Sequence, residues 1–407
     1  MGVISLHVLL VVVVVVTSAG CVELYTSRGT HYQVGLDVGQ HFQGAIQEYY
    51  AMMTDLHTKL LPFVETAGGS HIYDTYLRMA ETHFPQYVDE LRGIAVGAKL
   101  SFKQVFTNHI WDELSTLIGV KQKKSCTDVY VNDVGDEGPT VVTPQFSLGH
   151  NEDGSPNAKT RAYILHAIIV NNVTGTVEED FTSFTYPGEL PGDAYGFNIH
   201  GVVLTMNAVL PVIAGIGAVP RDFVLRATFA VKSQAELESL ILSEGTGVGY
   251  GYNLNYGNTQ DDVRSLVSYE VAPLENQPRA LVSKYTVGCH GVNDNTNTTG
   301  PYFHFNLYNH TDVVQMTSQL TSSYHRQARV AQIPEVRNTQ GALYVLGDTH
   351  DPDYPIYRTA RPTDEFSTLT TAFLNLVHCR LYIYVDNPFT GSRPFMNLTL
   401  PAGRQCH

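Results

Sequence analysis

The sequence of 407 residues predicts an α+β protein in which two β-sheets lie between layers of helices. Residues from about 22 to 120 carry apolar side chains at the three- and four-residue spacing of helices. After Cys126 the pattern changes to short apolar runs bounded by turn residues, which indicate strands. Two helical stretches interrupt those runs, and the order strands, helices, strands is typical of a layered α+β body.

The N-terminal region is expected to form four helices, over residues 35–61, 72–84, 87–98 and 101–118. Pro62 ends or kinks the first helix, because proline lacks the amide N–H of a helix interior. Ser101-Phe-Lys-Gln104 has the form of a capping box and opens the fourth helix, which Gly119 closes.

Strands are expected after Cys126 over residues 129–131, 141–148, 161–170, 181–186, 195–199, 202–208, 265–271, 280–287 and 381–385. A helix is expected near residues 221–231, and a second capping box, Ser233-Gln-Ala-Glu236, opens another. The Gly- and Tyr-rich segment 245–257 lacks the Lys-Ser/Thr ending of a phosphate-binding loop and is interpreted as a strand edge or a substrate loop.

Residues 1–20 have the features of a secretory signal peptide. An apolar run from Val8 to Val16 is followed by small residues, and cleavage is expected near Gly20. The run is short for a spanning helix, although an N-terminal anchor remains the alternative. Four glycosylation sequons, which favour a secreted or lysosomal protein, begin at Asn172, Asn297, Asn309 and Asn397.

Charge and cysteine content narrow the function classes. The formal net charge of −14 argues against a nucleic-acid partner, because binding to phosphates needs basic patches. Five cysteines in an oxidising compartment leave one thiol over. Cys379 with Cys406 is the expected disulfide, and Cys126 is the expected free thiol.

Cys126 follows a basic run and stands where helical character gives way to strands. We expect the chain to be cut between Ser125 and Cys126, which separates a helical segment, 21–125, from a catalytic part, 126–407. A new N-terminal cysteine carries its own base, because an α-amino group has a pKa of about 7.7–8 and can take the thiol proton. A buried structural or disulfide-bonded cysteine is the alternative.

Several motifs together resemble the acyl-coenzyme A:6-aminopenicillanic acid acyltransferase family of N-terminal-nucleophile hydrolases (peptidase family C45). These motifs are His31-Tyr-Gln-Val-Gly35 with Gly39, Pro85 to Gly97, Cys126-Thr127, Gly149-His-Asn-Glu-Asp-Gly154, Pro187-Gly-Glu-Leu-Pro-Gly192, Gly196 to Gly201 with Asn207, and Phe303-His-Phe-Asn306. The resemblance covers most of residues 30–390. It implies a four-layer αββα sandwich and self-cleavage into an α/β heterodimer.

The resemblance also implies roles for individual residues. Asp153 would hold the new α-ammonium group, Asn207 would donate to the oxyanion, and Asn306 would orient the Cys126 amine. Arg326 resembles a downstream arginine of the family. From the residues alone, the alternatives are a turn residue for Asp153, strand-end hydrogen bonding for Asn207, a structural role for Asn306 and a surface position for Arg326. Related bile salt hydrolases and ceramidases carry arginine where this chain has His150.

The expected activity is hydrolysis of an N-acyl amine, or acyl transfer where an amine or thiol acceptor competes with water. Animal members of the family act on β-alanyl amines, so an N-β-alanyl biogenic amine is the substrate class that the resemblance implies. An acid-ceramidase-like lipid amidase and a non-catalytic secreted glycoprotein are the alternatives. No cofactor is expected, and no zinc-type ligand spacing accompanies the seventeen histidines.

Overall fold

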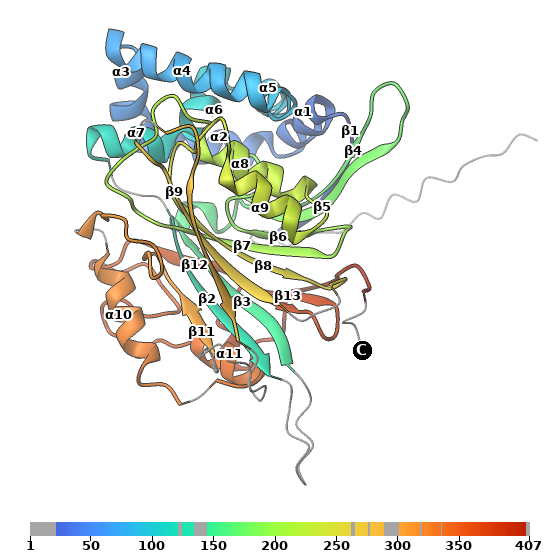
Figure 1. Ribbon diagram of the computed structural model, residues 1–407, viewed down its shortest axis with the longest axis vertical. Coiled ribbons are helices and arrows are strands. Elements are labelled where there is room, and N and C mark those ends of the chain that lie inside the picture. Colours follow the sequence, from blue (N-terminus) through green and yellow to red (C-terminus); the bar gives the residue numbers. More distant parts are fainter. Residues whose placement is uncertain are drawn as a thin grey trace, which may run out of the picture.

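The computed structural model describes residues 22–403 except 121–123, 134–144, 262–264, 276, 289–300, 318, 319 and 335. Within this part of the chain, two β-sheets face one another through β2 (Lys124–Asp133) and β7 (Val202–Ala208). Helices lie outside both sheets (Figure 1). The blue N-terminal helices gather on the side of the first sheet, and the orange α10 (Thr321–Val330) lies on the side of the second (Figure 1). The predicted mixed α+β architecture is therefore confirmed.

The first sheet contains eight strands among the described residues. In spatial order they are β1 (Glu23–Gly29), β4 (Tyr163–Val170), β5 (Val177–Thr185), β6 (Tyr195–Asn198), β7, β8 (Tyr252–Asn258), β9 (Leu266–Ala272) and β10 (Leu281–Val287). All neighbours are antiparallel except β1 and β4, which are parallel. The N-terminal region was expected to be largely helical, so β1 corrects that expectation.

The second sheet has six strands within the described chain, in the order β11 (Tyr302–His304), β2, β3 (Gln145–Gly154), β12 (Ser367–Asn375), β13 (Arg380–Tyr384) and β14 (Met396–Thr399). All ten residues of β2 are buried. The first sheet covers one face of β2 and α11 (Thr339–Leu346) packs against it as well. Apolar residues are confined to its middle, and its many buried polar side chains therefore need hydrogen-bond or ionic partners inside the protein.

The N-terminal helices are more broken than expected. They are α1 (His31–His41), α2 (Gln43–Ala51), a π-helical turn η1 (Leu56–Leu60), α3 (Leu61–Val64), α4 (Ala67–His83), α5 (Pro85–Ala98), α6 (Phe102–His109) and α7 (Trp111–Ile118). The first predicted helix instead starts earlier, at a capping box of Thr30 and Gln33. The Ser101 capping box is confirmed, but the helix that it opens breaks at Ile110.

Glycines allow α1 and α5 to pack backbone against backbone. A Cβ atom on Gly35 would lie 2.0 Å from the carbonyl oxygen of Glu90, and one on Gly93 would lie 2.3 Å from that of Tyr32. Any side chain at these positions would force the helices apart. The glycine motifs of this region therefore serve helix packing.

A buried ion cluster ties these helices to the first sheet. Arg226, on α8 (Arg221–Ala227), is 0% exposed and contacts Glu90 of α5 at 2.9 Å and Glu179 of β5 at 2.8 Å. The 3₁₀ turn η3 (Thr228–Ala230) follows α8, and α9 (Gln234–Leu242) begins at the predicted Ser233 cap. Both helices of this pair were predicted. Two further 3₁₀ turns are η2 (Pro156–Ala158) and η5 (Pro388–Thr390).

Several elements were absent from the sequence-based expectation. β8 lies inside the first sheet, so the interpretation of segment 245–257 as a strand edge or a substrate loop is wrong for residues 252–257. Strands β11, β12 and β14 and helices α10 and α11 were also not predicted.

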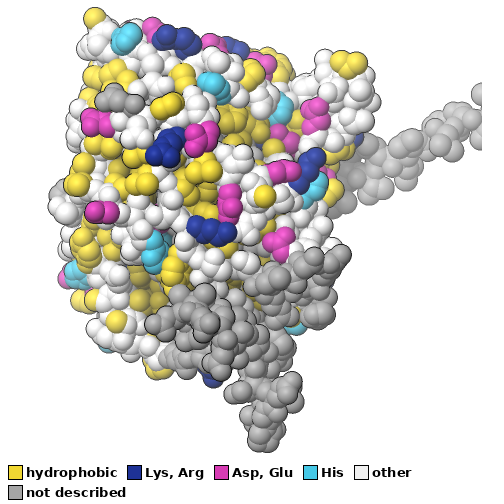
Figure 2. Space-filling model, in the orientation of Figure 1, with side chains coloured by type: hydrophobic (Ala, Val, Ile, Leu, Met, Phe, Trp, Pro, Cys, Tyr) yellow, Lys and Arg dark blue, Asp and Glu magenta, His cyan; other side chains and the backbone are white. Residues whose placement is uncertain are grey.

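Three of the four predicted glycosylation sequons lie within the described residues. Asn172, Asn309 and Asn397 are exposed, while Asn297 and the predicted signal peptide lie outside the described residues. Cys379 is disulfide-bonded to a partner that lies outside the described part of the chain. Among the described helices, none is long and apolar enough to cross a membrane. On the face in Figure 2, basic side chains are scattered among acidic ones rather than gathered into a patch.

Candidate active site

The peptide bond between Ser125 and Cys126 lies near the start of β2, paired on one side with β3. The Cys126 side chain is buried, and Cys126 is the free cysteine of the described residues. The predicted assignment of the free thiol to Cys126 therefore agrees with the structure. The alternative of a disulfide-bonded Cys126 is wrong.

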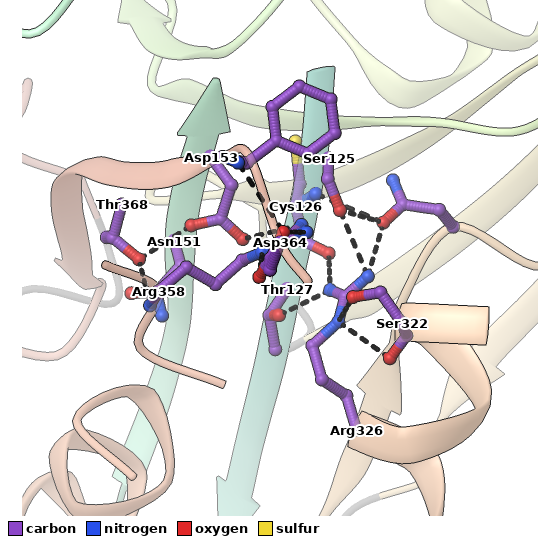
Figure 3. A network of polar contacts seen from close by, with 12 residues as sticks. Ser125, Cys126, Thr127, Asn151, Asp153, Ser322, Arg326, Arg358, Asp364 and Thr368 are labelled. Carbon is purple, nitrogen blue, oxygen red and sulfur yellow. Dashed lines mark hydrogen bonds and ion pairs between the residues drawn. The ribbon is translucent and has the colours of Figure 1, made fainter. Parts of the chain in front are cut away.

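Arg326 on α10 contacts both sides of this bond (Figure 3). Its Nη1 donates to the carbonyl oxygen of Cys126 and, at 2.8 Å, to Thr127 Oγ1. Its Nη2 donates to Ser125 Oγ at 3.0 Å. Arg326 is 0% exposed, so the alternative of a surface arginine is wrong. Burial and the neighbouring Arg358 lower the pKa of Arg326 to about 10.

Asn306 contacts the amide that cleavage would convert into an α-amine. Its Oδ1 accepts from the Cys126 backbone N–H at 3.2 Å and from Ser125 Oγ at 2.7 Å. Arg326 Nη2 donates to the same oxygen at 2.7 Å, and Asn306 Nδ2 donates to the Ala208 carbonyl at 2.7 Å. These bonds fix the amide group with its oxygen toward the bond.

Asp153 lies opposite Ser125 in the register of β2 and β3. Its Oδ1 accepts from Thr368 Oγ1 at 2.7 Å, whereas Oδ2 has no hydrogen-bond partner among the described residues. Arg358 Nη1 lies 3.9 Å from Oδ2. Burial raises the pKa of Asp153 to about 6, against the opposing effect of Arg358. One carboxylate oxygen beside the bond is therefore available to a new cation.

The thiol itself faces a buried relay of charged side chains. Cys126 Sγ lies 3.8 Å from Glu152 Oε2, and that oxygen lies 3.0 Å from His150 Nε2. His150 Nδ1 contacts the Asp128 carboxylate at 3.1 Å, and Tyr186 donates its hydroxyl hydrogen to Glu152 Oε1. Sequence reasoning missed Asp128, Glu152 and Tyr186, because their relation to the thiol depends on strand pairing.

Burial and the carboxylates of Asp128 and Glu152 set the pKa values of His150 and Cys126. Burial lowers the pKa of His150, but Asp128 outweighs burial and the pKa ends well above its usual value. The two carboxylates therefore favour the protonated form of His150. Burial, followed by Glu152, raises the pKa of the Cys126 thiol to about 12. The thiol of the uncut chain is therefore protonated.

Cys126, His150 and Glu152 each offer one ligand atom, and these atoms lie within 4.8 Å of one another. A thiolate, an imidazole and a carboxylate form a ligand set that suits zinc. One of these three groups is the thiol of the predicted nucleophile. An ion bound here would therefore occupy that thiol. Sequence spacing gave no sign of this cluster, since it joins two strands.

Asn207, on β7, is buried near these groups but its polar atoms have other partners. Its Nδ2 donates to the carbonyl oxygens of His304 at 3.2 Å and Phe305 at 3.3 Å, and its Oδ1 accepts from Asn255 at 3.2 Å. The structure thus brings Cys126, Asp153, Asn306 and Arg326 around one bond. The oxyanion role of Asn207 stays a prediction.

Sequence reasoning also missed a site around Lys124, two residues before Cys126. Its ammonium Nζ donates to Glu189 Oε2 at 2.7 Å and to Asp193, and lies 3.9 Å from the centre of the Tyr186 ring. Glu189 lies within the Pro187–Gly192 motif, but its pairing with a residue 65 positions away has no local signal. A groove lined by Ser125, Asn306, Ser323, Arg326 and Arg358 reaches the same segment.

Comparison with known proteins agrees with the motifs. A solved structure of penicillin V acylase from Agrobacterium tumefaciens is 9% identical and aligns over 65% of this chain and 76% of its own, at a TM-score of 0.28. The β-alanyl-dopamine/carcinine hydrolase of Drosophila melanogaster is 26% identical over 379 residues, which are 90% of this chain and 92% of that protein.

A family model also matches residues 143–389, more than half of the chain. That model describes acyl-coenzyme A:6-aminopenicillanic acid acyl-transferases. The chain therefore belongs to this family (peptidase family C45) and is an enzyme of the N-terminal-nucleophile hydrolase class, as its motifs predict.

Proposed function

We propose that this protein is a self-cleaving amide hydrolase whose nucleophile is Cys126, acting on N-acyl amines. One observation carries the proposal: Arg326, Asn306 and Asp153 converge on the Ser125–Cys126 bond from three separate elements, beside a free buried thiol. Family membership accounts for the reaction class. Convergence of buried polar groups on one peptide bond has no evident structural need.

Cleavage would begin with attack of Cys126 Sγ on the carbonyl carbon of Ser125. The thiol proton passes to Glu152, whose Oε2 is the acceptor 3.8 Å away. The C–N bond breaks, the Cys126 nitrogen gains a proton and becomes an amine, and Ser125 is left as a thioester on Sγ. Water then hydrolyses that thioester, which gives Ser125 a carboxylate and regenerates the thiol. Arg326 and Asn306 keep the bond and the attacking group aligned.

Turnover would use the groups that cleavage creates. The new α-amine takes the Cys126 proton, and Asp153 Oδ2 holds the resulting ammonium. The thiolate attacks the acyl carbon of the substrate, and Asn207 donates to the oxyanion, which contributes about 3–4 kcal/mol for one well-placed donor. The α-ammonium returns the proton to the leaving amine, and water cleaves the thioester. An amine acceptor in place of water makes the same site an acyltransferase.

The four-layer αββα sandwich of N-terminal-nucleophile hydrolases is the finer fold assignment that we propose. The helix–sheet–sheet–helix order of the described chain supports it. After cleavage the two chains would remain a heterodimer, because β1 is hydrogen-bonded to β4 and Glu90 is paired with Arg226. Secretion or delivery to the lysosome, with glycans on exposed sequons, completes the proposal.

An N-β-alanyl biogenic amine is the substrate class that we propose, on the strength of the Drosophila relative's name. The charged lining of the site also favours a small polar acyl group over the acyl chain of a ceramide. Lys124, Arg326 and Arg358 line the groove that reaches Ser125. An acid-ceramidase-like activity therefore has less support.

The test compares purified wild-type protein with Cys126→Ala on a reducing gel and in two assays, one with a β-alanyl amine and one with a lipid amide. We expect two bands and β-alanyl amide hydrolysis for the wild type, and one band without activity for the variant. A single full-length band for both proteins would refute the proposal. Preferential turnover of the lipid amide would keep the mechanism and overturn the substrate class.

A further inference from the structure

We infer that Glu189, Asp193 and the face of Tyr186 form the acyl-group pocket of the cleaved enzyme, that this pocket binds a primary ammonium group, and that Lys124 occupies it only before cleavage. The inference rests on the proposed function, because cleavage turns Lys124 and Ser125 into a free C-terminal end that can withdraw while the two chains stay together. It assigns a recognition site to the acyl part of the substrate.

The pocket is built around an ammonium group that is already in place. The Lys124 side chain is 6% exposed, and its Nζ contacts two buried carboxylates. It lies 2.7 Å from Glu189 Oε2 and also donates to Asp193 Oδ2. The Tyr186 ring lies beneath it at 3.9 Å, a cation–π distance. A neutral or bulky anionic group could not replace these contacts, whereas another primary ammonium could.

The position of the pocket relates it to the nucleophile. Tyr186 contacts Lys124 with its ring and Glu152 with its hydroxyl group, and Glu152 lies 3.8 Å from Cys126 Sγ. A single phenol side chain therefore separates the ammonium site from the carboxylate next to the thiol. Lys124 and Cys126 also stand two residues apart on β2, so their side chains leave the same face of the strand. A short acyl chain on Sγ that ends in an ammonium group would extend along this face toward the site.

Lys124 also separates two spaces in the uncut chain. On one side it lines the groove with Ser125 and Arg326, and on the other it lines an inner cavity with Glu189 and Asp193. Departure of Lys124 joins the groove to the acidic pair. It also removes an ammonium that contacts both carboxylates, and the loss of a charged partner from a buried carboxylate is costly.

Arg221, the other cation of the cluster, has carboxylate partners of its own and would not take the place of the Lys124 ammonium. Arg221 contacts Asp112 at 2.6 Å and Asp222 at 2.9 Å, and reaches Asp193 at 3.3 Å. Glu189 instead pairs with Lys124 and accepts from Asn108 at 3.0 Å. Both carboxylates would lose Lys124 on cleavage, but Asp193 keeps its contact with Arg221, so Glu189 is the specificity-determining residue of the pocket.

The experiment compares two amides of the same amine on the cleaved enzyme, β-alanyl and butanoyl, in which a methyl group replaces the ammonium. We expect kcat/KM to favour the β-alanyl amide by roughly 100-fold or more, because the site would otherwise bury its charges unpaired. Glu189→Gln should reduce this preference at least tenfold. Asp222→Asn, which alters the same cluster without touching Lys124, should retain it.

The outcomes distinguish failure of the pocket from failure of the proposed function. Equal turnover of both amides by cleaved wild type overturns the pocket and leaves the hydrolase. A strong β-alanyl preference that survives in Glu189→Gln places the ammonium elsewhere and also overturns the pocket. An uncut chain overturns both, since Lys124 then stays bound. The wild-type comparison needs no variant, so a poorly folding Glu189→Gln still leaves the inference refutable.

Discussion

Replacing Asp153 by asparagine in a chain that cannot be cut should increase stability at neutral pH. The pKa of Asp153 rises from 3.8 to about 6 in the folded chain because the carboxyl group is fully buried. Since one pKa unit corresponds to about 1.36 kcal/mol, ionised Asp153 destabilises the fold by roughly 3 kcal/mol. Asparagine removes the charge and keeps an oxygen for the Thr368 hydroxyl.

The sign of the pH dependence follows from the raised pKa. The folded chain binds the Asp153 proton more tightly than the unfolded chain, so the destabilisation is fully present above about pH 6 and is lost as the pH falls toward 3.8. The gain from Asp153→Asn should therefore reach up to roughly 3 kcal/mol near neutral pH and vanish near pH 4.

The assay is urea unfolding of Cys126→Ala with and without Asp153→Asn, followed across this pH range. Asp364→Asn is the matched control, because Asp364 is a buried carboxylate that accepts from Arg358 Nε at 2.7 Å. Loss of that pair should destabilise the fold by roughly 3–5 kcal/mol. A destabilising Asp153→Asn, or a gain that does not change with pH, would contradict the reasoning. In the Cys126 chain the same substitution should lower amide hydrolysis.

Four further expectations concern the bond, the relay, the core and metal ions. Arg326→Lys should slow self-cleavage by about 100-fold in a gel time course, because one ammonium cannot replace both arms of the guanidinium. Glu152→Gln should slow self-cleavage more than turnover of the cleaved enzyme, since only the uncut thiol lacks an α-amine. Arg226→Met should lower the free energy of unfolding by roughly 3–5 kcal/mol, measured by urea denaturation, because it removes the guanidinium group that the buried Glu90 and Glu179 share. A chelator should leave cleavage and hydrolysis unchanged, whereas added Zn²⁺ should inhibit both reversibly.

Local signals in the sequence predicted much of the fold. The Ser101 and Ser233 caps set helix starts correctly, because side-chain capping acts within four residues. β1 was missed because it pairs with β4, about 140 residues later, and five of its seven residues are not buried. β8 was missed because its Gly, Asn and Tyr residues lack the usual apolar strand pattern.

In the candidate site, too, residues with a local sequence signal could be predicted and contacts between distant residues could not. Cys126 could be predicted because it combines an odd cysteine count with a change from helix to strand. Asp153, Asn306 and Arg326 came from motifs, and the structure places them around one bond. The pairing of Lys124 with Glu189 could not be predicted, since only the folded chain brings the two residues together.

Intact-mass spectrometry of the purified full-length protein tests the central claim most directly, because it reports the N-terminus of each chain. The account predicts a chain that begins at Cys126, together with a partner that ends at Ser125. Cys126→Ala should give one uncut mass, and a slowly hydrolysed β-alanyl substrate should add one acyl group to the chain that begins at Cys126. A wild-type protein that remains a single uncut chain, or an acyl adduct on a residue other than Cys126, would contradict the account.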